Sequence, residues 1–238
     1  MLKRPQGGAA RLIAALDVAD TAAATRLCGT LRARVGLVKL GLEFFLAQGP
    51  AGVRAVAEAA PPIFLDLKLH DIPNTVAGAV RSVLPLRPAM LTLHAGGGRA
   101  MLEAAREAAE AAGEARPMLL AVTVLTSLGA GALAETGVAG GPVQQVLRLA
   151  HMADAAGIDG LVCSAAEVAP IRAALGDRLA LVVPGIRPAG SALDDQARVA
   201  TPASAVALGA DWLVVGRPIT QASDPARSAQ AIAESIAA

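Results

Sequence analysis

Residues 63–75 of the chain read Ile-Phe-Leu-Asp-Leu-Lys-Leu-His-Asp-Ile-Pro-Asn-Thr. The first seven positions are apolar except for Asp66 and Lys68, which predicts a buried strand. Side chains two positions apart in a strand share a face, so Asp66 and Lys68 point the same way. Asp71 follows just beyond the strand, and Pro73 suits the first turn of a helix. Three ionisable groups therefore meet at the end of one buried strand.

Buried charges are costly unless they are paired, so this cluster is either a structural ion pair or part of a reaction site. Lysine usage favours a reaction site. The chain has three lysines among 21 basic residues, and two of them, Lys39 and Lys68, lie in apolar strand-like segments. An ammonium group can donate its proton, whereas a guanidinium is always charged. Chance placement of the lysines is the alternative.

Apolar strand-like segments alternate with alanine-rich helical segments along the whole chain. The expected strands are residues 12–18, 36–41, 63–69, 90–95, 118–125, 160–164, 180–186 and 212–219. The expected helices include residues 21–34, 45–59, 99–112, 143–156 and 165–175. Eight such units predict an α/β fold, a (β/α)8 TIM barrel forming a single domain over residues 1–238, with a flexible N-terminal segment at 1–10. An open doubly wound sheet is the alternative, but no GxGxxG motif follows the first strand.

Composition narrows the class of protein. Hydrophobic residues make up 54% of the chain, and the core must be built from aliphatic side chains because there are three Phe, one Trp and no Tyr. The net charge is +1 without a basic run, so neither nucleic acid nor an anionic membrane is expected as a partner. Two distant cysteines, a short polar N-terminus and the lack of a long apolar run predict a soluble cytoplasmic protein.

In a barrel of this type the active site lies at the carboxyl ends of the strands, so polar residues there are candidate site residues. On the first three strands these residues are Asp17, Lys39, Asp66, Lys68 and Asp71. After the fifth, seventh and eighth strands they are Thr126, Ser127, Pro184, Arg187, Gly216 and Arg217. Glycine amides and arginines after the last two strands suit a phosphate group. For Arg187 an ordinary surface position is the alternative.

Two long stretches, residues 129–142 and 187–196, are rich in glycine or polar residues and are predicted to be lids over the site. The histidines His70, His94 and His151 do not form a ligand set, and no metal is expected. For His94 a hydrogen-bonded structural role is favoured over a role in the site.

These residues resemble the orotidine 5′-phosphate decarboxylase family over nearly the whole chain. The most specific match is the run D-x-K-x-x-D-I-P-N-T at residues 66–75. Weaker matches, in the family's order, are Ala15-Leu16-Asp17, Val38-Lys39-Leu40-Gly41, Leu93-His94-Ala95, Val124-Leu125-Thr126-Ser127, Val183-Pro184-Gly185-Ile186-Arg187 and Val215-Gly216-Arg217-Pro218-Ile219. The resemblance implies decarboxylation of orotidine 5′-phosphate to UMP, the last step of de novo pyrimidine synthesis. It also implies a homodimer that needs no cofactor.

The same resemblance implies a role for each site residue. The residues implied at C6 of the pyrimidine, where Lys68 donates the proton, are Lys39, Asp66, Lys68 and Asp71. Those implied to reach into the partner subunit's site are Asp71, Ile72 and Thr75. Those implied at the ribose are Asp17 and Lys39, and at the base Thr126 and Ser127. Those implied at the phosphate and its closing loop are Arg187, Gln196, Gly216 and Arg217, with Pro184 also expected to contact substrate.

Three other functions fit part of the pattern. A Mg²⁺-dependent phosphosugar decarboxylase or aldolase shares D-x-K-x-x-D, but that group carries an acid for the metal on strand two, where this chain has Lys39, with Glu43 one helical turn onward. A Schiff-base aldolase would use Lys68 as its nucleophile, although two neighbouring carboxylates would keep that lysine protonated. A non-catalytic nucleotide-binding barrel is disfavoured because every charged position is retained.

Overall fold

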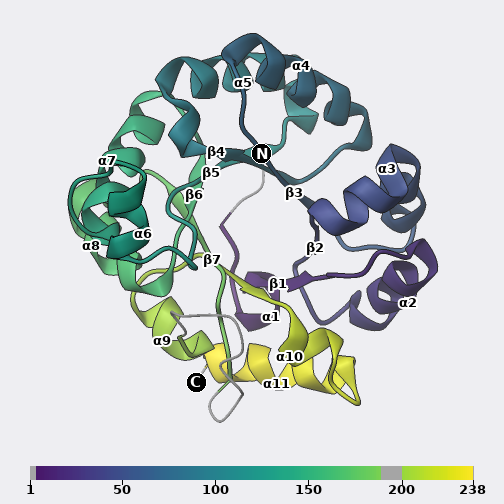
Figure 1. Ribbon diagram of the computed structural model, residues 1–238. Helices are drawn as coiled ribbons and strands as arrows, with labels where there is room; N and C mark the ends of the chain where they lie inside the picture. Colours follow the sequence, from purple (N-terminus) through teal and green to yellow (C-terminus); the bar gives the residue numbers. More distant parts are fainter. Residues whose placement is uncertain (1–3, 189–199, 238) are drawn as a thin grey trace.

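The computed structural model describes residues 4–188 and 200–237. Within them, eight parallel strands close into a barrel in the order β1 to β8, with helices around it (Figure 1). The strands are β1 Leu12–Ala15, β2 Leu37–Leu40, β3 Ile63–Leu69, β4 Met90–His94, β5 Met118–Val122, β6 Gly160–Val162, β7 Ala180–Val183 and β8 Trp212–Val215. The α-helices are α1 Gly8–Arg11, α2 Thr21–Leu31, α3 Leu42–Ala57, α4 Pro73–Val83, α5 Arg99–Glu110, α6 Ala130–Glu135, α7 Pro142–Ala155, α8 Ala165–Leu175, α9 Pro202–Ala207, α10 Arg217–Thr220 and α11 Pro225–Ala237. The expected TIM barrel is confirmed.

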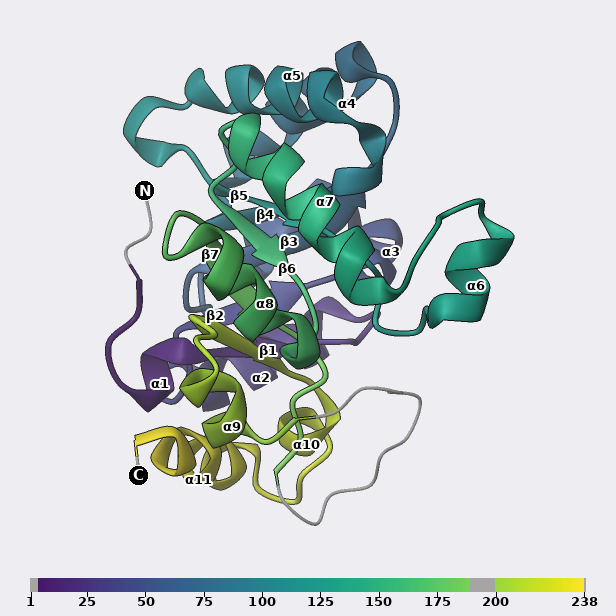
Figure 2. The ribbon, with the colours of Figure 1, turned by 90° about the vertical axis from the view of Figure 1, so that its left-hand side faces the viewer.

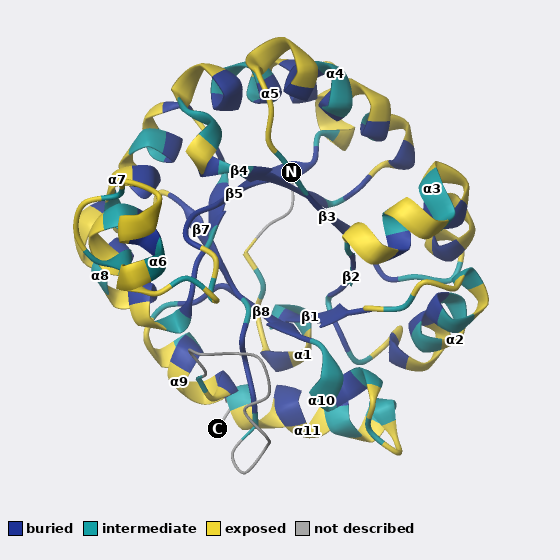
Figure 3. Ribbon diagram, viewed as in Figure 1, coloured by how far each residue is buried: buried dark blue, intermediate teal, exposed yellow. Residues whose placement is uncertain are grey.

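The two faces of each strand supply two apolar layers. Inward side chains such as Phe64, Met90 and Trp212 fill the barrel interior. Outward side chains such as Leu65 and Leu91 pack under the helices in a second and larger cluster. Figure 3 shows the result, with buried strands in the centre and helices buried only on their inner faces. Both faces of the sheet are thus covered, as parallel strands require.

The inward face changes from apolar to charged toward the carboxyl ends of the first three strands. A charged residue follows an inward apolar residue by two positions on each strand. These pairs are Ala15 and Asp17, Leu37 and Lys39, and Phe64 and Asp66. The strand period of two therefore places the charges above the apolar filling of the barrel, where this fold holds its active site.

Several expected elements differ from the observed ones. The eighth expected strand, 212–219, is wrong in its last part, because β8 ends at Val215 and α10 begins at Arg217 with a proline in its first turn. The stretch 129–142 contains α6, which projects from the barrel in Figure 2. Most of the other expected lid, 187–196, lies outside the described residues.

The segment 1–10, expected to be flexible, overlaps the short helix α1, which begins at Gly8. Gly8 is buried in α1, and a Cβ there would lie 1.9 Å from the carbonyl oxygen of Ala233 in α11. Close backbone contact of this kind admits only glycine. The helix α1 is therefore packed against α11, and residues 1–3 lie outside the described part of the chain.

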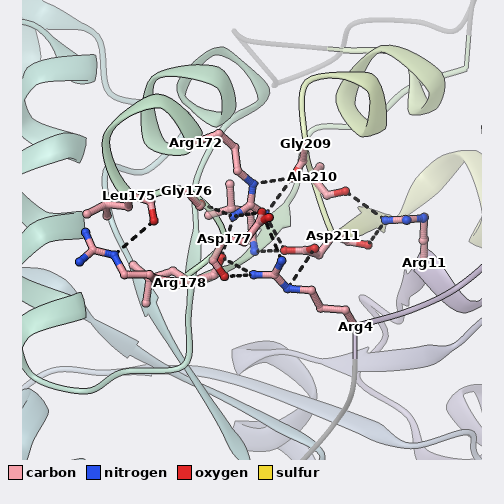
Figure 4. A network of polar contacts seen from close by, with 12 residues as sticks. Arg4, Arg11, Arg172, Leu175, Gly176, Asp177, Arg178, Gly209, Ala210 and Asp211 are labelled. Carbon is pink, nitrogen blue, oxygen red and sulfur yellow. Dashed lines mark hydrogen bonds and ion pairs between the residues drawn. The ribbon is translucent and has the colours of Figure 1, made fainter.

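A polar network stabilises the amino-terminal end of the barrel, opposite the charged inward positions (Figure 4). Asp211, just before β8, accepts hydrogen bonds from the Arg172 guanidinium at 2.7 Å and from the Leu181 backbone N–H at 2.8 Å. Asp159, just before β6, does the same with Arg116 at 2.9 Å and the Leu119 N–H at 2.7 Å. Each carboxylate thus ties one strand to its neighbour, from a buried position at Asp211 and a half-buried one at Asp159.

None of the helices in the described part of the chain combines the length and apolar character that a membrane crossing requires.

Candidate active site

A cavity of about 450 Å³ lies at the carboxyl ends of the strands. Its apolar floor is formed by the inward residues Phe64, Val122, Val162 and Val214. Its polar lining consists of Asp17, Lys39, Asp66, Lys68, Thr126, Arg187, Arg217, Thr220 and Gln221. Pro184, Gly185 and Gly216 complete the rim. Side chains from strands far apart in the sequence are therefore gathered into one polar cavity.

Four charges alternate along one wall of this cavity. Lys39 Nζ lies 3.6 Å from Asp17 Oδ1 and 3.3 Å from Asp66 Oδ2. Lys68 Nζ lies 2.9 Å from the other oxygen of Asp66. The order is Asp17, Lys39, Asp66, Lys68. The two internal charges each have an opposite charge on both sides, and the two end charges each have one opposite neighbour. The expectation that Asp66 and Lys68 share a face is confirmed.

Asp66 is the centre of this array and is almost fully buried. Burial alone would raise the pKa of its carboxyl group, but the positive charges of Lys39 and Lys68 lower this pKa. Hydrogen bonds from Lys68 and Thr92 act in the same direction as the two ammonium groups, and the net pKa of Asp66 lies below its ordinary value. Asp66 is therefore ionised at neutral pH and holds two ammonium groups at defined positions.

Two arginines that follow the neighbouring strands β7 and β8 line the same cavity. Arg187 follows β7 and is 7% exposed, so the alternative of an ordinary surface position is wrong. Arg217 is the first residue of α10, directly after Gly216. A Cβ on Gly216 would lie 3.5 Å from Asp17 Oδ2, an ordinary contact distance, so this part of the rim lies beside the Asp17 carboxylate. Two guanidinium groups near glycine backbone suit a bound phosphate.

Four expected site residues lie apart from the cavity lining. Asp71, Ile72 and Thr75 are exposed around the start of α4, and the Asp71 carboxylate accepts a hydrogen bond from the Ile72 N–H at 2.6 Å. Ser127 is exposed beyond β5. Gln196 falls outside the described residues. The expected start of a helix at Pro73 is confirmed by α4.

The expected structural role of His94 agrees with its contacts. Its Nδ1 accepts a hydrogen bond from the Gly96 N–H at 3.2 Å, and its ring stacks on that of His70 with centroids 5.0 Å apart. Burial, followed by the nearby His70 and Lys68, lowers the pKa of His94 from its ordinary value. His94 is thus a neutral, hydrogen-bonded group beside the array at pH 7.

The sequence reasoning missed Thr92, Thr220 and Gln221. Thr220 and Gln221 line the cavity from the end of α10 and its C-cap, just beyond the expected strand 212–219. Thr92 is fully buried on β4 and donates a hydrogen bond to Asp66. The alternation of the strand could have predicted its inward position, because Thr92 is two positions after the inward Met90.

Among residues 4–188 and 200–237, no three side chains of His, Cys, Asp or Glu come together as a candidate ligand set. The two cavity carboxylates that are close to each other, Asp17 and Asp66, share the ammonium group of Lys39.

Comparison with known proteins agrees with this geometry. The family model described as "Orotidine 5'-phosphate decarboxylase / HUMPS family" matches residues 10–232. The orotidine 5′-phosphate decarboxylase of Gluconobacter oxydans is 56% identical over 230 residues, covering 95% of this chain and 97% of that protein. The enzyme of the same name from Rhodospirillum rubrum is 56% identical, covering 93% and 92%.

Solved structures agree as well. The crystal structure of orotidine 5′-phosphate decarboxylase from Lactobacillus acidophilus superposes with a TM-score of 0.85 at 37% identity, covering 95% of this chain and 99% of that one. A family match across almost the whole barrel, together with relatives sharing more than half of their residues, identifies the relationship: the chain belongs to the orotidine 5′-phosphate decarboxylase / HUMPS family.

Proposed function

We propose that this protein catalyses the decarboxylation of orotidine 5′-phosphate to UMP, the last step of de novo pyrimidine synthesis, and that it needs no cofactor. The observation that carries the proposal is the alternating array of Asp17, Lys39, Asp66 and Lys68 in a cavity that also holds two arginines. The names of relatives that are more than 50% identical over nearly their whole length support the same reaction.

The reaction breaks the bond between C6 and the carboxylate and leaves the electron pair on C6 as CO2 departs. This carbanion has no π-system to delocalise it, so the site must stabilise it electrostatically. Lys68 holds an ammonium group 2.9 Å from Asp66, poised on the cavity wall. In the proposed mechanism Lys68 stabilises the developing charge and donates a proton to C6. The lysine then regains a proton from water.

The remaining cavity residues divide the substrate between them. Asp17 and Lys39 are proposed to bind ribose hydroxyls, and Thr126 with Ser127 to face the base. Arg187 and Arg217 are proposed to bind the phosphate together with the Gly216 backbone. Pro184 lines the cavity beside Arg187, and Gln196 is proposed to act in the loop that closes over the phosphate. Phosphate binding far from C6 then supplies energy for closure around the reacting atoms.

The phosphosugar alternative within this family is disfavoured by Lys39. The second strand places an ammonium group between Asp17 and Asp66, so both carboxylates near the cavity centre already face a positive charge. The Schiff-base alternative is disfavoured by Asp66, whose contact with Lys68 favours the protonated and non-nucleophilic amine. A Mg²⁺-dependent enzyme of the phosphosugar class instead needs carboxylates that are available to bind the metal ion.

A homodimer with shared sites is proposed from the residues near the start of α4. Asp71, Ile72 and Thr75 lie outside the cavity of their own chain, and Ile72 is 66% exposed. The helix α3 is next to α4 around the barrel (Figure 1), and its residue Leu46 is 80% exposed. Exposed apolar side chains next to charged ones suit a protein interface. In the proposed dimer these three residues enter the partner's cavity, where Asp71 completes the charge array.

A cytoplasmic location is proposed from the thiols. Cys28 and Cys163 are both buried and form no disulfide, and burial raises the pKa of Cys28 to about 11. Thiols in this state suit a reducing compartment.

The test is the loss of orotidine 5′-phosphate absorbance with purified protein, with EDTA and without added metal. We expect turnover by the parent and none detectable by Lys68→Ala, whose fold is checked by its unfolding transition. An EDTA-sensitive activity would indicate the phosphosugar class. A folded Lys68→Ala protein that retains activity within tenfold of the parent would refute the proton-donor role.

A further inference from the structure

Thr92 makes two hydrogen bonds that connect it to both ends of Lys68. Its hydroxyl accepts a hydrogen bond from the Lys68 backbone N–H at 2.9 Å. The same hydroxyl donates to Asp66 Oδ1, also at 2.9 Å, and that oxygen accepts the Lys68 ammonium. The contacts form a closed ring from the Lys68 backbone through Thr92 and Asp66 back to the Lys68 side chain. Thr92 itself is fully buried and does not line the cavity.

The backbone at this point is irregular, which explains why a side chain is needed there. Leu65 pairs with Leu91 and Leu69 pairs with Leu93, so three residues of β3 lie opposite Thr92 alone. Such a bulge leaves backbone groups without their usual partners in the ladder. The Lys68 N–H is one of them, and the Thr92 hydroxyl replaces the missing acceptor.

Lys68 also adopts an uncommon conformation. Its φ is +48°, and only Lys68 and Arg87 among the described non-glycine residues have a positive φ. The left-handed region costs a residue with a Cβ about 1 kcal/mol or more, so the surroundings must hold it in place. Strain of this kind is typical of functional sites. At Lys68 it directs the ammonium group toward Asp66 and the cavity.

Loss of the hydroxyl would also change Asp66. The carboxylate would lose one of its hydrogen-bond donors while staying buried, which raises the pKa of its carboxyl group. A carboxylate with one donor fewer would be protonated at a higher pH than in the parent, and protonation would loosen its hold on both ammonium groups. Backbone geometry and carboxylate charge therefore depend on one buried hydroxyl.

We infer that Thr92 is a positioning residue for the decarboxylation, because its hydroxyl holds the strained Lys68 backbone and the Asp66 carboxylate in the arrangement that proton donation needs. The inference rests on the proposed function. It concerns a group that touches no substrate and acts only through Lys68 and Asp66.

The test compares Thr92→Val, which replaces the hydroxyl with a methyl group of similar size, with Thr92→Ser, which keeps the hydroxyl. Thr123→Val is the matched control, because Thr123 is also buried and its hydroxyl donates only to the Val162 carbonyl, at 2.9 Å. Steady-state kcat and KM for orotidine 5′-phosphate, the Kd of UMP and the unfolding transition are measured for each protein.

We expect kcat of Thr92→Val to fall by about 10- to 100-fold, the range for losing a hydrogen bond to a charged group. KM and the UMP Kd should stay within about threefold, because Thr92 lies outside the cavity lining. Thr92→Ser and Thr123→Val should stay within about threefold in kcat. On the acid side, the pH of half-maximal kcat/KM should rise only in Thr92→Val, since the reaction needs Asp66 ionised.

Other outcomes overturn the inference. A folded Thr92→Val protein with kcat within threefold of the parent would do so, and so would equal losses in Thr92→Ser or Thr123→Val. If Thr92→Val does not fold, the same comparison is made between Thr92→Ser and Thr92→Ala. An inactive parent refutes the proposed function itself, whereas an active parent with an unaffected Thr92→Val refutes only the role of Thr92.

Discussion

A mixed dimer of Lys68→Ala and Asp71→Ala chains should contain one intact site, which neither mutant has alone. Lys68 lines the cavity of its own chain, where its ammonium lies 2.9 Å from Asp66. Asp71 is exposed at the start of α4 and its carboxylate contacts the Ile72 N–H of its own chain. If Asp71 serves the partner's cavity, both substitutions of a mixed dimer fall in the same site and the other site has neither.

The size of the effect follows from this division. One site of the mixed dimer takes Lys68 from the Asp71→Ala chain and Asp71 from the Lys68→Ala chain, so all its charges are present. The other site carries both defects. Random exchange makes about half of the dimers mixed, so roughly a quarter of all sites should recover. The expected activity is therefore about 25% of an equal amount of the parent protein.

The assay unfolds the two mutants together, refolds them at equal concentration and measures loss of orotidine 5′-phosphate absorbance. The matched control pairs Lys68→Ala with Asp66→Ala. Both of these residues line the cavity of one chain, so every site of that mixed dimer keeps one defect and no activity should return. Mixed dimers that form on size exclusion but remain as inactive as this control would show that Asp71 serves its own chain.

Two further predictions concern the opposite ends of the barrel. Arg217→Ala should lower kcat/KM for orotidine 5′-phosphate by about 30- to 900-fold, from about 2–4 kcal/mol of lost charge-assisted binding, and should scarcely affect orotidine without its phosphate; an equal loss on both substrates would exclude a phosphate contact. Asp211→Ala should lower the free energy of unfolding by about 3 kcal/mol in denaturant titrations, because it leaves the Leu181 N–H and the Arg172 guanidinium short of a partner. Asp177→Ala, at a side chain 80% exposed in the same network, should cost less than about 1 kcal/mol, and equal losses would contradict this account.

The barrel and most of its site could be predicted because they depend on local periodicity. The alternation around Asp66 and Lys68 gives their shared face, and β3 has the expected bounds. The charged residues at the ends of strands one to three were identified because few polar residues interrupt apolar segments. The burial of Arg187 could not be predicted, since a single arginine after a strand has no pattern that distinguishes a buried position from an exposed one.

What the sequence did not predict depends on contacts between strands. The bulge between Leu65 and Leu69 is a property of the register with β4, which no single strand reveals. Thr92 looks like an ordinary β-former in the segment Met90–His94, and its importance appears only when it lies opposite Lys68. The change from strand to helix at α10 likewise depends on where the chain leaves the barrel rather than on hydropathy.

The charges of the cavity suggest why its two halves cooperate. The formal charges of Asp17, Lys39, Asp66 and Lys68 sum to zero within the array, and Arg187 and Arg217 add two positive charges to the cavity lining. In the proposed complex a phosphate of nearly two negative charges balances the arginines. The substrate carboxylate then adds a negative charge that no group of this cavity balances, and in the proposed complex it lies close to Asp66. Asp71 from the partner would add a second negative charge. Loss of CO2 and proton transfer from Lys68 to C6 remove the negative charge of the substrate carboxylate from the pyrimidine. The site therefore stabilises the transition state more than the bound substrate.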